Sequence, residues 1–219
     1  MKRFVKYTGI VVALVGITVA VGFSADQKRV RPPVPPSPKG VADVGQKAPD
    51  FVLLDTDGKT VTLQQYLTAG KTVVLYWFNA HCEVIINHFE RAKTLPDLYS
   101  AYNRRKVVFL AINSTNPKHA DFGGDAARKK DWLIHYPILL DPSGTVGKLY
   151  GAKTTPHVFI ITSDGTIRYS GAIDNDPMGQ KMGPSHIEYV SQALDEILAG
   201  KPVSEPKTHP YGCQVGYAR

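Results

Sequence analysis

The sequence is poor in cysteine, because Cys82 and Cys213 are the only two among its 219 residues. No cysteine lies near the apolar N-terminal segment, so a lipid-modified N-terminus is excluded. The residues that follow Cys82 are Glu83, Val84 and Ile85, so the chain also lacks a Cys-x-x-Cys arrangement with a second thiol close to the first. The only second thiol that this chain offers to Cys82 is therefore Cys213.

Excess charge is missing from most of the chain, although the formal net charge is +7. Residues 1–40 hold seven of the 26 basic side chains and one of the 19 acidic ones. That leaves 19 bases against 18 acids, a net charge of +1, for residues 41–219. A near-neutral domain does not present the basic surface that nucleic acids require, so we expect no nucleic-acid partner.

The N-terminus has the pattern of a targeting segment. Lys2, Arg3 and Lys6 precede an apolar run over residues 8–23. Its length of about 16 residues exceeds the roughly 7–15 of a signal-peptide core and falls short of the roughly 20 of a spanning helix. We expect residues 1–25 to be a signal peptide or an N-terminal membrane anchor, and both alternatives stay open. Either one commonly delivers the following domain outside the cytoplasm, so we expect a periplasmic or secreted protein, membrane-associated if the segment is not cleaved.

The rest of the chain divides into three parts. Residues 26–43 contain many prolines and are expected to form an extended linker. A chain of this length with 43% hydrophobic residues buries one good core, which we assign to residues 44–200. Residues 201–219 form a tail rich in proline and glycine that carries Cys213, and we expect this tail to be mobile.

Strand and helix patterns alternate along the domain. The residue types favour strands at 51–54, 60–63, 72–78, 107–112, 137–140, 157–162 and 166–170, and helices at 83–102, 125–135, 143–150 and after 185. Pro96 is expected to kink or divide the helix over 83–102. Residues 185–188 have a capping-box pattern that marks the start of the last helix, and Gly200 marks its end. The alternation predicts an α/β sandwich around a mixed sheet.

Cys82 lies at the junction between a strand and a helix. Residues 72–78 are mostly β-branched and aromatic, which favours a buried strand, and the pattern becomes helical from Glu83 onward. The unpaired amide groups and the dipole at a helix N-terminus stabilise a thiolate, the nucleophilic form of cysteine. We therefore interpret Cys82 as a reactive thiol. The alternative is a small buried hydrophobic residue.

Several segments, in their order along the chain, resemble the thioredoxin-fold redoxins of the AhpC/TSA superfamily and their thiol-disulfide oxidoreductase relatives. These segments are residues 45–51, 57–63, the strand that ends at Cys82, 154–160 and 164–171. Residues 154–160 resemble the cis-proline loop of that fold, with Pro156 as the proline, and 164–171 resemble the hairpin that follows it. The resemblance covers residues 44–200. It implies a thioredoxin-like three-layer α/β/α sandwich with a central mixed sheet.

The resemblance also implies roles for single residues. Cys82 would be the catalytic nucleophile that attacks a substrate disulfide. Thr155 and Pro156 would lie across from Cys82 and present their backbone to an extended peptide, which would bind by strand addition. Trp77 is assigned with them to substrate binding, as part of the pocket wall.

Cys213 would be the second catalytic residue. Its Gly-Cys setting resembles the tails of some redoxin-like proteins that carry a cysteine after the domain. There it would resolve the mixed disulfide formed at Cys82. A redox-active pair, a permanent structural disulfide and no pairing all stay open as descriptions of Cys82 and Cys213.

The activity that the resemblance implies is that of an extracytoplasmic thiol-disulfide oxidoreductase, an antioxidant redoxin without a cofactor. Its partners would be protein or small-molecule disulfides as substrates and a thiol as electron donor. One alternative is a weak thiol peroxidase that oxidises Cys82 to a sulfenic acid. Peroxiredoxins have proline seven residues, and threonine or serine three residues, before the reactive cysteine, whereas this chain has Leu75 and Asn79 there. Another alternative is a binding module that keeps the fold and has lost turnover.

A metal site is a further alternative. His81, His88 and Cys82, together with Met178 or Met182, have the donor atoms of a soft copper site. Copper chaperones of the same fold usually bring a second cysteine close to the first, and this chain has none there. We therefore expect no metal.

Overall fold

The computed structural model describes residues 40–181 and 183–218. The predicted signal peptide or anchor over residues 1–25, and most of the predicted linker over 26–43, lie outside the described residues. Among the helices that the structure describes, none is long and apolar enough to cross a lipid bilayer.

Seven strands form one mixed sheet in the order β2-β1-β5-β4-β3-β7-β8. They are β1 (Val52–Asp55), β2 (Thr60–Thr62), β3 (Thr72–Trp77), β4 (Val107–Asn113), β5 (Ile138–Leu140), β7 (Val158–Ile161) and β8 (Ile167–Gly171). β3 pairs with β4 and β4 with β5 in parallel, and the other neighbouring strands are antiparallel. β3 has strands on both edges and helices over both faces, so each of its residues is buried.

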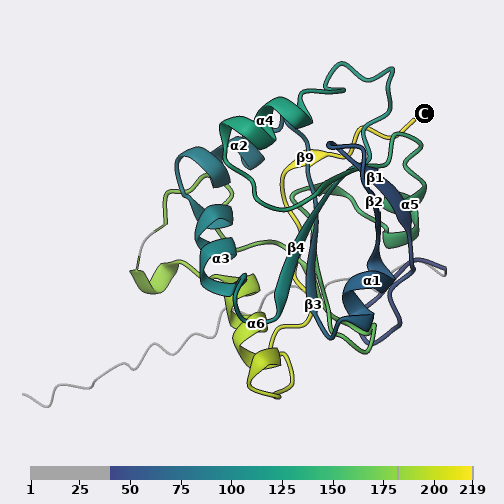
Figure 1. Ribbon diagram of the computed structural model, residues 1–219. Helices are drawn as coiled ribbons and strands as arrows, with labels where there is room; N and C mark the ends of the chain where they lie inside the picture. Colours follow the sequence, from purple (N-terminus) through teal and green to yellow (C-terminus); the bar gives the residue numbers. More distant parts are fainter. Residues whose placement is uncertain (1–39, 182, 219) are drawn as a thin grey trace, which may run out of the picture. The chain divides into compact units, whose positions relative to one another are not determined.

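Helices cover the two faces of this sheet (Figure 1), with α2, α3, α4 and α6 on one side and α1 and α5 on the other. They are α1 (Leu63–Thr68), α2 (Glu83–Glu90), α3 (Thr94–Tyr102), α4 (Asp125–Asp131), α5 (Thr145–Tyr150) and α6 (Tyr189–Leu198). Side chains alternate along β3, so Val74 and Tyr76 pack in the core beneath the first group, and Val73, Leu75 and Trp77 pack in the core beneath the second. The predicted three-layer sandwich is confirmed.

The helix predicted over residues 83–102 is divided, but Pro96 is not the point of division. α2 ends at Glu90, and α3 begins after Lys93, whose φ of 59° is left-handed. Pro96 lies in the first turn of α3, where the missing N–H would have had no partner within the helix. The chain therefore breaks before the proline.

Two other predicted helix boundaries are wrong. α4 ends at Asp131 and not near His135, because Leu133 takes a left-handed φ of 52°. The capping box at 185–188 does not form, and α6 begins at Tyr189. Asn175 binds that segment instead: its Nδ2 donates to the carbonyl of Ser185 (3.0 Å), and its Oδ1 accepts from the N–H of Ile187 (3.0 Å).

The C-terminal tail runs back along the domain. The N–H of Ser170 donates to the carbonyl of Pro206 (3.0 Å), and the N–H of Thr208 donates to the carbonyl of Ser170 (3.2 Å). Further on, β9 (Cys213–Gln214) pairs antiparallel with β6 (Thr154–Thr155) in a separate two-stranded sheet. The tail, which we expected to be mobile, is thus paired with the domain.

Candidate active site

Cys82 lies where β3 gives way to α2, as the residue pattern predicts. It is the N-cap residue of α2, and its carbonyl oxygen accepts from the N–H of Ile86 (2.9 Å). The residue is only 3% exposed. The first N–H groups of a helix have no partner within it, and the Cys82 side chain makes no capping hydrogen bond to them.

Two groups from distant parts of the chain reach the sulfur of Cys82. Its Sγ donates to the carbonyl oxygen of Thr155 (3.0 Å), and the Sγ of Cys213 lies 2.7 Å away. Both cysteines are free thiols in this structure. The two residues predicted to be catalytic are therefore in contact.

Cys213 has different surroundings from Cys82. It is an exposed residue, although its sulfur faces the site. Burial of that sulfur, followed by the hydrogen bond and the charge of Cys82, raises the pKa of the Cys213 thiol to about 11. At neutral pH Cys213 is therefore protonated.

Thr155 and Pro156 form the other wall of the site. Their peptide bond is cis, as the resemblance implied, and Thr155 lies opposite Cys213 in the pairing of β6 with β9. Gly212 has a φ of 126°, and a Cβ there would lie 2.1 Å from the carbonyl oxygen of Thr155, so this close approach requires glycine. The strand edge that we expected to receive a substrate peptide is paired with the tail of the same chain.

His157 supports this wall from the core. Its Nε2 lies 3.2 Å from the hydroxyl of Ser170, and its carbonyl accepts from the N–H of Trp77 (3.0 Å). Burial, and then the charge of Lys153, lowers the pKa of the His157 imidazole to about 3. The ring is therefore neutral at physiological pH and holds the start of β7.

Trp77 does not lie in the site. It has no exposed surface, and its Nε1 donates to the hydroxyl of Ser114 (3.0 Å). It packs against Tyr150 and Phe159 in the core beneath α1 and α5, whereas Cys82 belongs to the core on the other face. A fully buried side chain offers no surface to a substrate, so the structure gives no support to a substrate-binding role for Trp77.

Asn79 shapes the loop that leads to Cys82. Its Nδ2 donates to the hydroxyl of Thr115 (2.8 Å) and to the carbonyl of Asp121 (3.1 Å), and its Oδ1 accepts from the N–H of His81 (2.8 Å). The amide that stands where peroxiredoxins carry a hydroxyl is thus fully engaged within the protein.

Sequence reasoning missed a second group of polar residues behind Cys82. His88 and Thr94 form a group with Asp174 and Tyr211, which come from the C-terminal part of the chain. The only signal for this group in the sequence was His88, which we had considered only as a copper ligand. Among the residues that the structure describes, no group of three or more His, Cys, Asp or Glu side chains is arranged to hold a metal ion.

Comparison with known proteins gives the family. The AhpC/TSA family model matches residues 44–170, more than half of the chain. The chain belongs to the AhpC/TSA family. This redoxin is 27% identical over 163 residues to the thiol-disulfide oxidoreductase ResA of Bacillus cereus (strain ATCC 10987 / NRS 248), a match that covers 72% of this chain and 82% of that protein.

Solved structures support the same fold. A hypothetical protein from Sinorhizobium meliloti 1021 superposes on the redoxin with a TM-score of 0.71 at 24% identity, covering 81% of this chain and 96% of that one. The thioredoxin domain of a thiol-disulfide oxidoreductase from Bacteroides vulgatus has a TM-score of 0.50 at 19% identity, covering 63% and 94%. The family match ends at residue 170, so both Asp174 and Cys213 lie beyond it.

Proposed function

We propose that the redoxin is an extracytoplasmic thiol-disulfide oxidoreductase in which Cys82 is the nucleophile and Cys213 is the resolving thiol. The observation that carries this proposal is the 2.7 Å separation of the two sulfurs beside the carbonyl of Thr155. The name of the Bacillus relative supports the reaction type. The location outside the cytoplasm rests on the basic and apolar pattern of residues 1–25.

The reaction has two exchange steps. The Cys82 thiolate attacks one sulfur of a substrate disulfide, which forms a mixed disulfide and releases the other substrate sulfur as a thiolate. Cys213 then attacks the Cys82 sulfur, its proton passes to the departing substrate thiolate, and a Cys82–Cys213 disulfide remains. Two electrons have reached the substrate, and an external thiol donor restores both cysteines.

Thr155 and Pro156 supply the substrate contacts in this proposal. The backbone of β6 offers hydrogen bonds to an extended peptide whose disulfide reaches Cys82, by the strand addition that β9 now makes. The substrate class is therefore protein or small-molecule disulfides. Trp77 is left out of the substrate site because it is fully buried.

The test is a disulfide-exchange assay on the purified full chain. Reduced protein is mixed with a disulfide-bonded peptide, and the products are mapped by mass spectrometry without reduction. We expect reduced peptide together with a Cys82–Cys213 disulfide. Failure of Cys82 to react with the peptide or with an alkylating agent at neutral pH, together with no Cys82–Cys213 pairing, would favour a binding module that has lost turnover.

A weak thiol peroxidase is the second candidate. It shares the Cys82 nucleophile and the Cys213 partner, but the engaged amide of Asn79 offers no hydroxyl to orient a peroxide. If the protein consumed hydrogen peroxide faster than it reduced the peptide disulfide, the thiol peroxidase would become the first candidate.

A further inference from the structure

The tail and a substrate peptide compete for the same strand edge, if the proposed function holds. β9 pairs with β6 at the position where an extended substrate would add, and Cys213 lies directly opposite Thr155. The sulfur that resolves the mixed disulfide therefore occupies the place of the substrate. A working cycle requires the tail to leave this edge and return to it.

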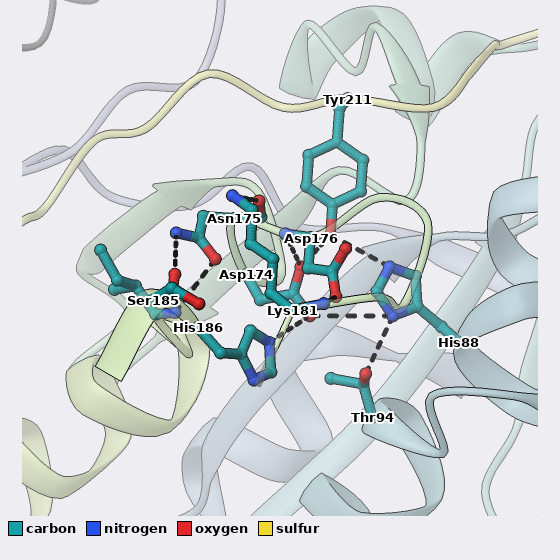
Figure 2. Close-up of polar contacts among 10 residues, drawn as sticks. His88, Thr94, Asp174, Asn175, Asp176, Lys181, Ser185, His186 and Tyr211 are labelled. Carbon is teal, nitrogen blue, oxygen red and sulfur yellow. Dashed lines mark hydrogen bonds and ion pairs between the residues drawn. The ribbon is translucent and has the colours of Figure 1, made fainter. Parts of the chain in front are cut away.

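The tail is fastened by a residue two positions before Cys213. The hydroxyl of Tyr211 donates to Asp174 Oδ1 and lies 3.0 Å from His88 Nε2, so it bridges the two side chains (Figure 2). The rings of Tyr211 and His88 are stacked, with centroids 6.0 Å apart. His88 belongs to α2, the helix that begins at Cys82. The bridge thus joins the tail to the element that carries the nucleophile.

The direction of the hydrogen bonds in this bridge follows from the donors available. Tyr211 has one hydroxyl proton, which goes to the carboxylate of Asp174, so the hydroxyl oxygen accepts from His88 Nε2. His88 Nδ1 then accepts from the hydroxyl of Thr94 (3.0 Å). Burial lowers the pKa of His88 against the opposing charges of Asp174 and Asp176, which agrees with a neutral ring that has one donor.

Asp174 is held in place without the tail. Its Oδ1 accepts from the N–H of Asp176 (2.8 Å), and its Oδ2 lies 3.2 Å from His186 Nε2. Asp176 in turn accepts from the N–H of Lys181 (2.6 Å). Asp174 and His88 are 1% and 0% exposed. With the tail docked, the acceptor Asp174 and the donor His88 are both buried, and Tyr211 is the one member of this group that lies on the tail.

We propose that Tyr211 is a positioning residue whose hydroxyl, bound between His88 and Asp174, sets the effective concentration of Cys213 at Cys82. When the bridge holds, Cys213 is next to Cys82 and internal resolution is fast. When it opens, β6 is free to bind a peptide. Tyr211 thereby sets the balance between substrate entry and resolution.

The test compares the full-length Tyr211→Phe variant with the wild type and with Tyr102→Phe. Tyr102 is a matched control because its hydroxyl donates to the carbonyl of Ser191 (3.2 Å) in the domain, away from the tail. The first readout is the fraction of Cys82–Cys213 disulfide in thiol buffers of graded potential. Loss of a hydrogen bond to a buried carboxylate should lower the effective concentration of Cys213 roughly tenfold to a hundredfold, with no change in Tyr102→Phe.

The second readout separates positioning from a general loss of structure. In Tyr211→Phe the KM for a disulfide-bonded peptide should fall, because the competing strand is held less tightly, while kcat falls because resolution is slower. A small disulfide that does not need β6 should show the fall in kcat alone. Unchanged redox equilibrium and unchanged KM in a folded Tyr211→Phe protein would overturn the proposal.

A third readout does not depend on thiol chemistry. The N–H of Val215 donates to the carbonyl of Lys153 (3.1 Å), and its hydrogen exchange should accelerate in Tyr211→Phe. Wild-type protein without exchange activity would refute the proposed function, whereas equal protection of Val215 in both proteins would refute the bridge.

Should Tyr211→Phe fail to fold, Thr94→Val removes the hydroxyl that orients His88, and the same shifts, smaller in size, are expected. No shift in Thr94→Val would then count against the proposal.

Discussion

The two cysteines meet at one point but are held there in different ways. Cys82 is fixed by the domain core: it follows a fully buried strand, its N–H donates to the carbonyl of Asn79 (3.2 Å), and its carbonyl starts α2. Cys213 lies on a strand of two residues that pairs only with β6 within the described chain. Tyr211 and Tyr217 hold that strand on either side, Tyr217 through the carbonyl of Ala152 (2.9 Å). Cys82, the proposed nucleophile, is therefore held by the core of the domain, whereas Cys213, the proposed resolving thiol, is held by a short strand and its flanking tyrosines.

The largest effect that tests this difference is the loss of each thiol in turn. Cys82→Ser should reduce disulfide exchange on the order of a thousandfold or more, as expected when a catalytic nucleophile is removed. Cys213→Ser should keep the first attack and lose resolution, so a mixed disulfide with the substrate should accumulate. Mass spectrometry without reduction detects that adduct. If Cys82→Ser formed the adduct and Cys213→Ser did not, the two roles would have to be exchanged.

Local residue patterns and the family resemblance predicted the part of the site that contains Cys82 and Pro156. The apolar residues of β3 and the change to a helical pattern at Glu83 placed Cys82 at a helix N-terminus, and the likeness to a redoxin loop located Pro156. The pairing of β6 with β9 was not predictable, because strands of two residues have no periodicity and join distant parts of the chain. The role of Tyr211 could not be recognised in the sequence, since its partners His88 and Asp174 come from α2 and from the loop after β8.

Competing local contacts explain the other errors. Residues 185–188 have the pattern of a capping box, but Asn175 binds the backbone of Ser185 and Ile187 instead. The lysine side chain at position 93 does not indicate a left-handed backbone. The break in the helix was therefore predicted at Pro96, three residues too late. Trp77 was assigned to the pocket wall, whereas its side chain is fully buried in the core.

Gly212 tests whether docking of the tail holds Cys213 at Cys82. Gly212→Ala places a Cβ 2.1 Å from the carbonyl of Thr155 at a residue whose φ is 126°. Strain of about 1–3 kcal/mol should undock β9 and reduce formation of the Cys82–Cys213 disulfide by up to roughly a hundredfold. Alkylation of Cys82 should become faster at the same time, as its cover is removed.

Gly200→Ala is the matched control for this variant. Gly200 also has a positive φ, of 70°, but a Cβ there has open space around it, and the residue lies after α6. We expect some loss of thermal stability and an unchanged redox equilibrium. A redox shift of equal size in both variants would mean that the tail responds to general destabilisation.

The smallest expected effect concerns the protonation of Cys213 in the folded chain and in a short peptide. The pKa of Cys213 is raised to about 11, so only a small fraction is thiolate at pH 8. Iodoacetamide reacts with thiolates, and the greater nucleophilicity of a more basic thiolate offsets part of that deficit. Alkylation of Cys213 in the reduced chain at pH 8 should therefore be about tenfold slower than in a peptide of residues 208–219.

The pH profile distinguishes a raised pKa of Cys213, caused first by burial, from simple blocking of the reagent. The rate for the peptide should level off above its ordinary thiol pKa of about 8.5, whereas the rate for the folded chain should continue to rise through pH 9.5. A slow rate that levels off near pH 8.5 in both samples would point to steric protection by β6 alone. In that case burial and the hydrogen bond with Cys82 would have no part in keeping Cys213 protonated, and docking of the tail would be sufficient to explain its low reactivity.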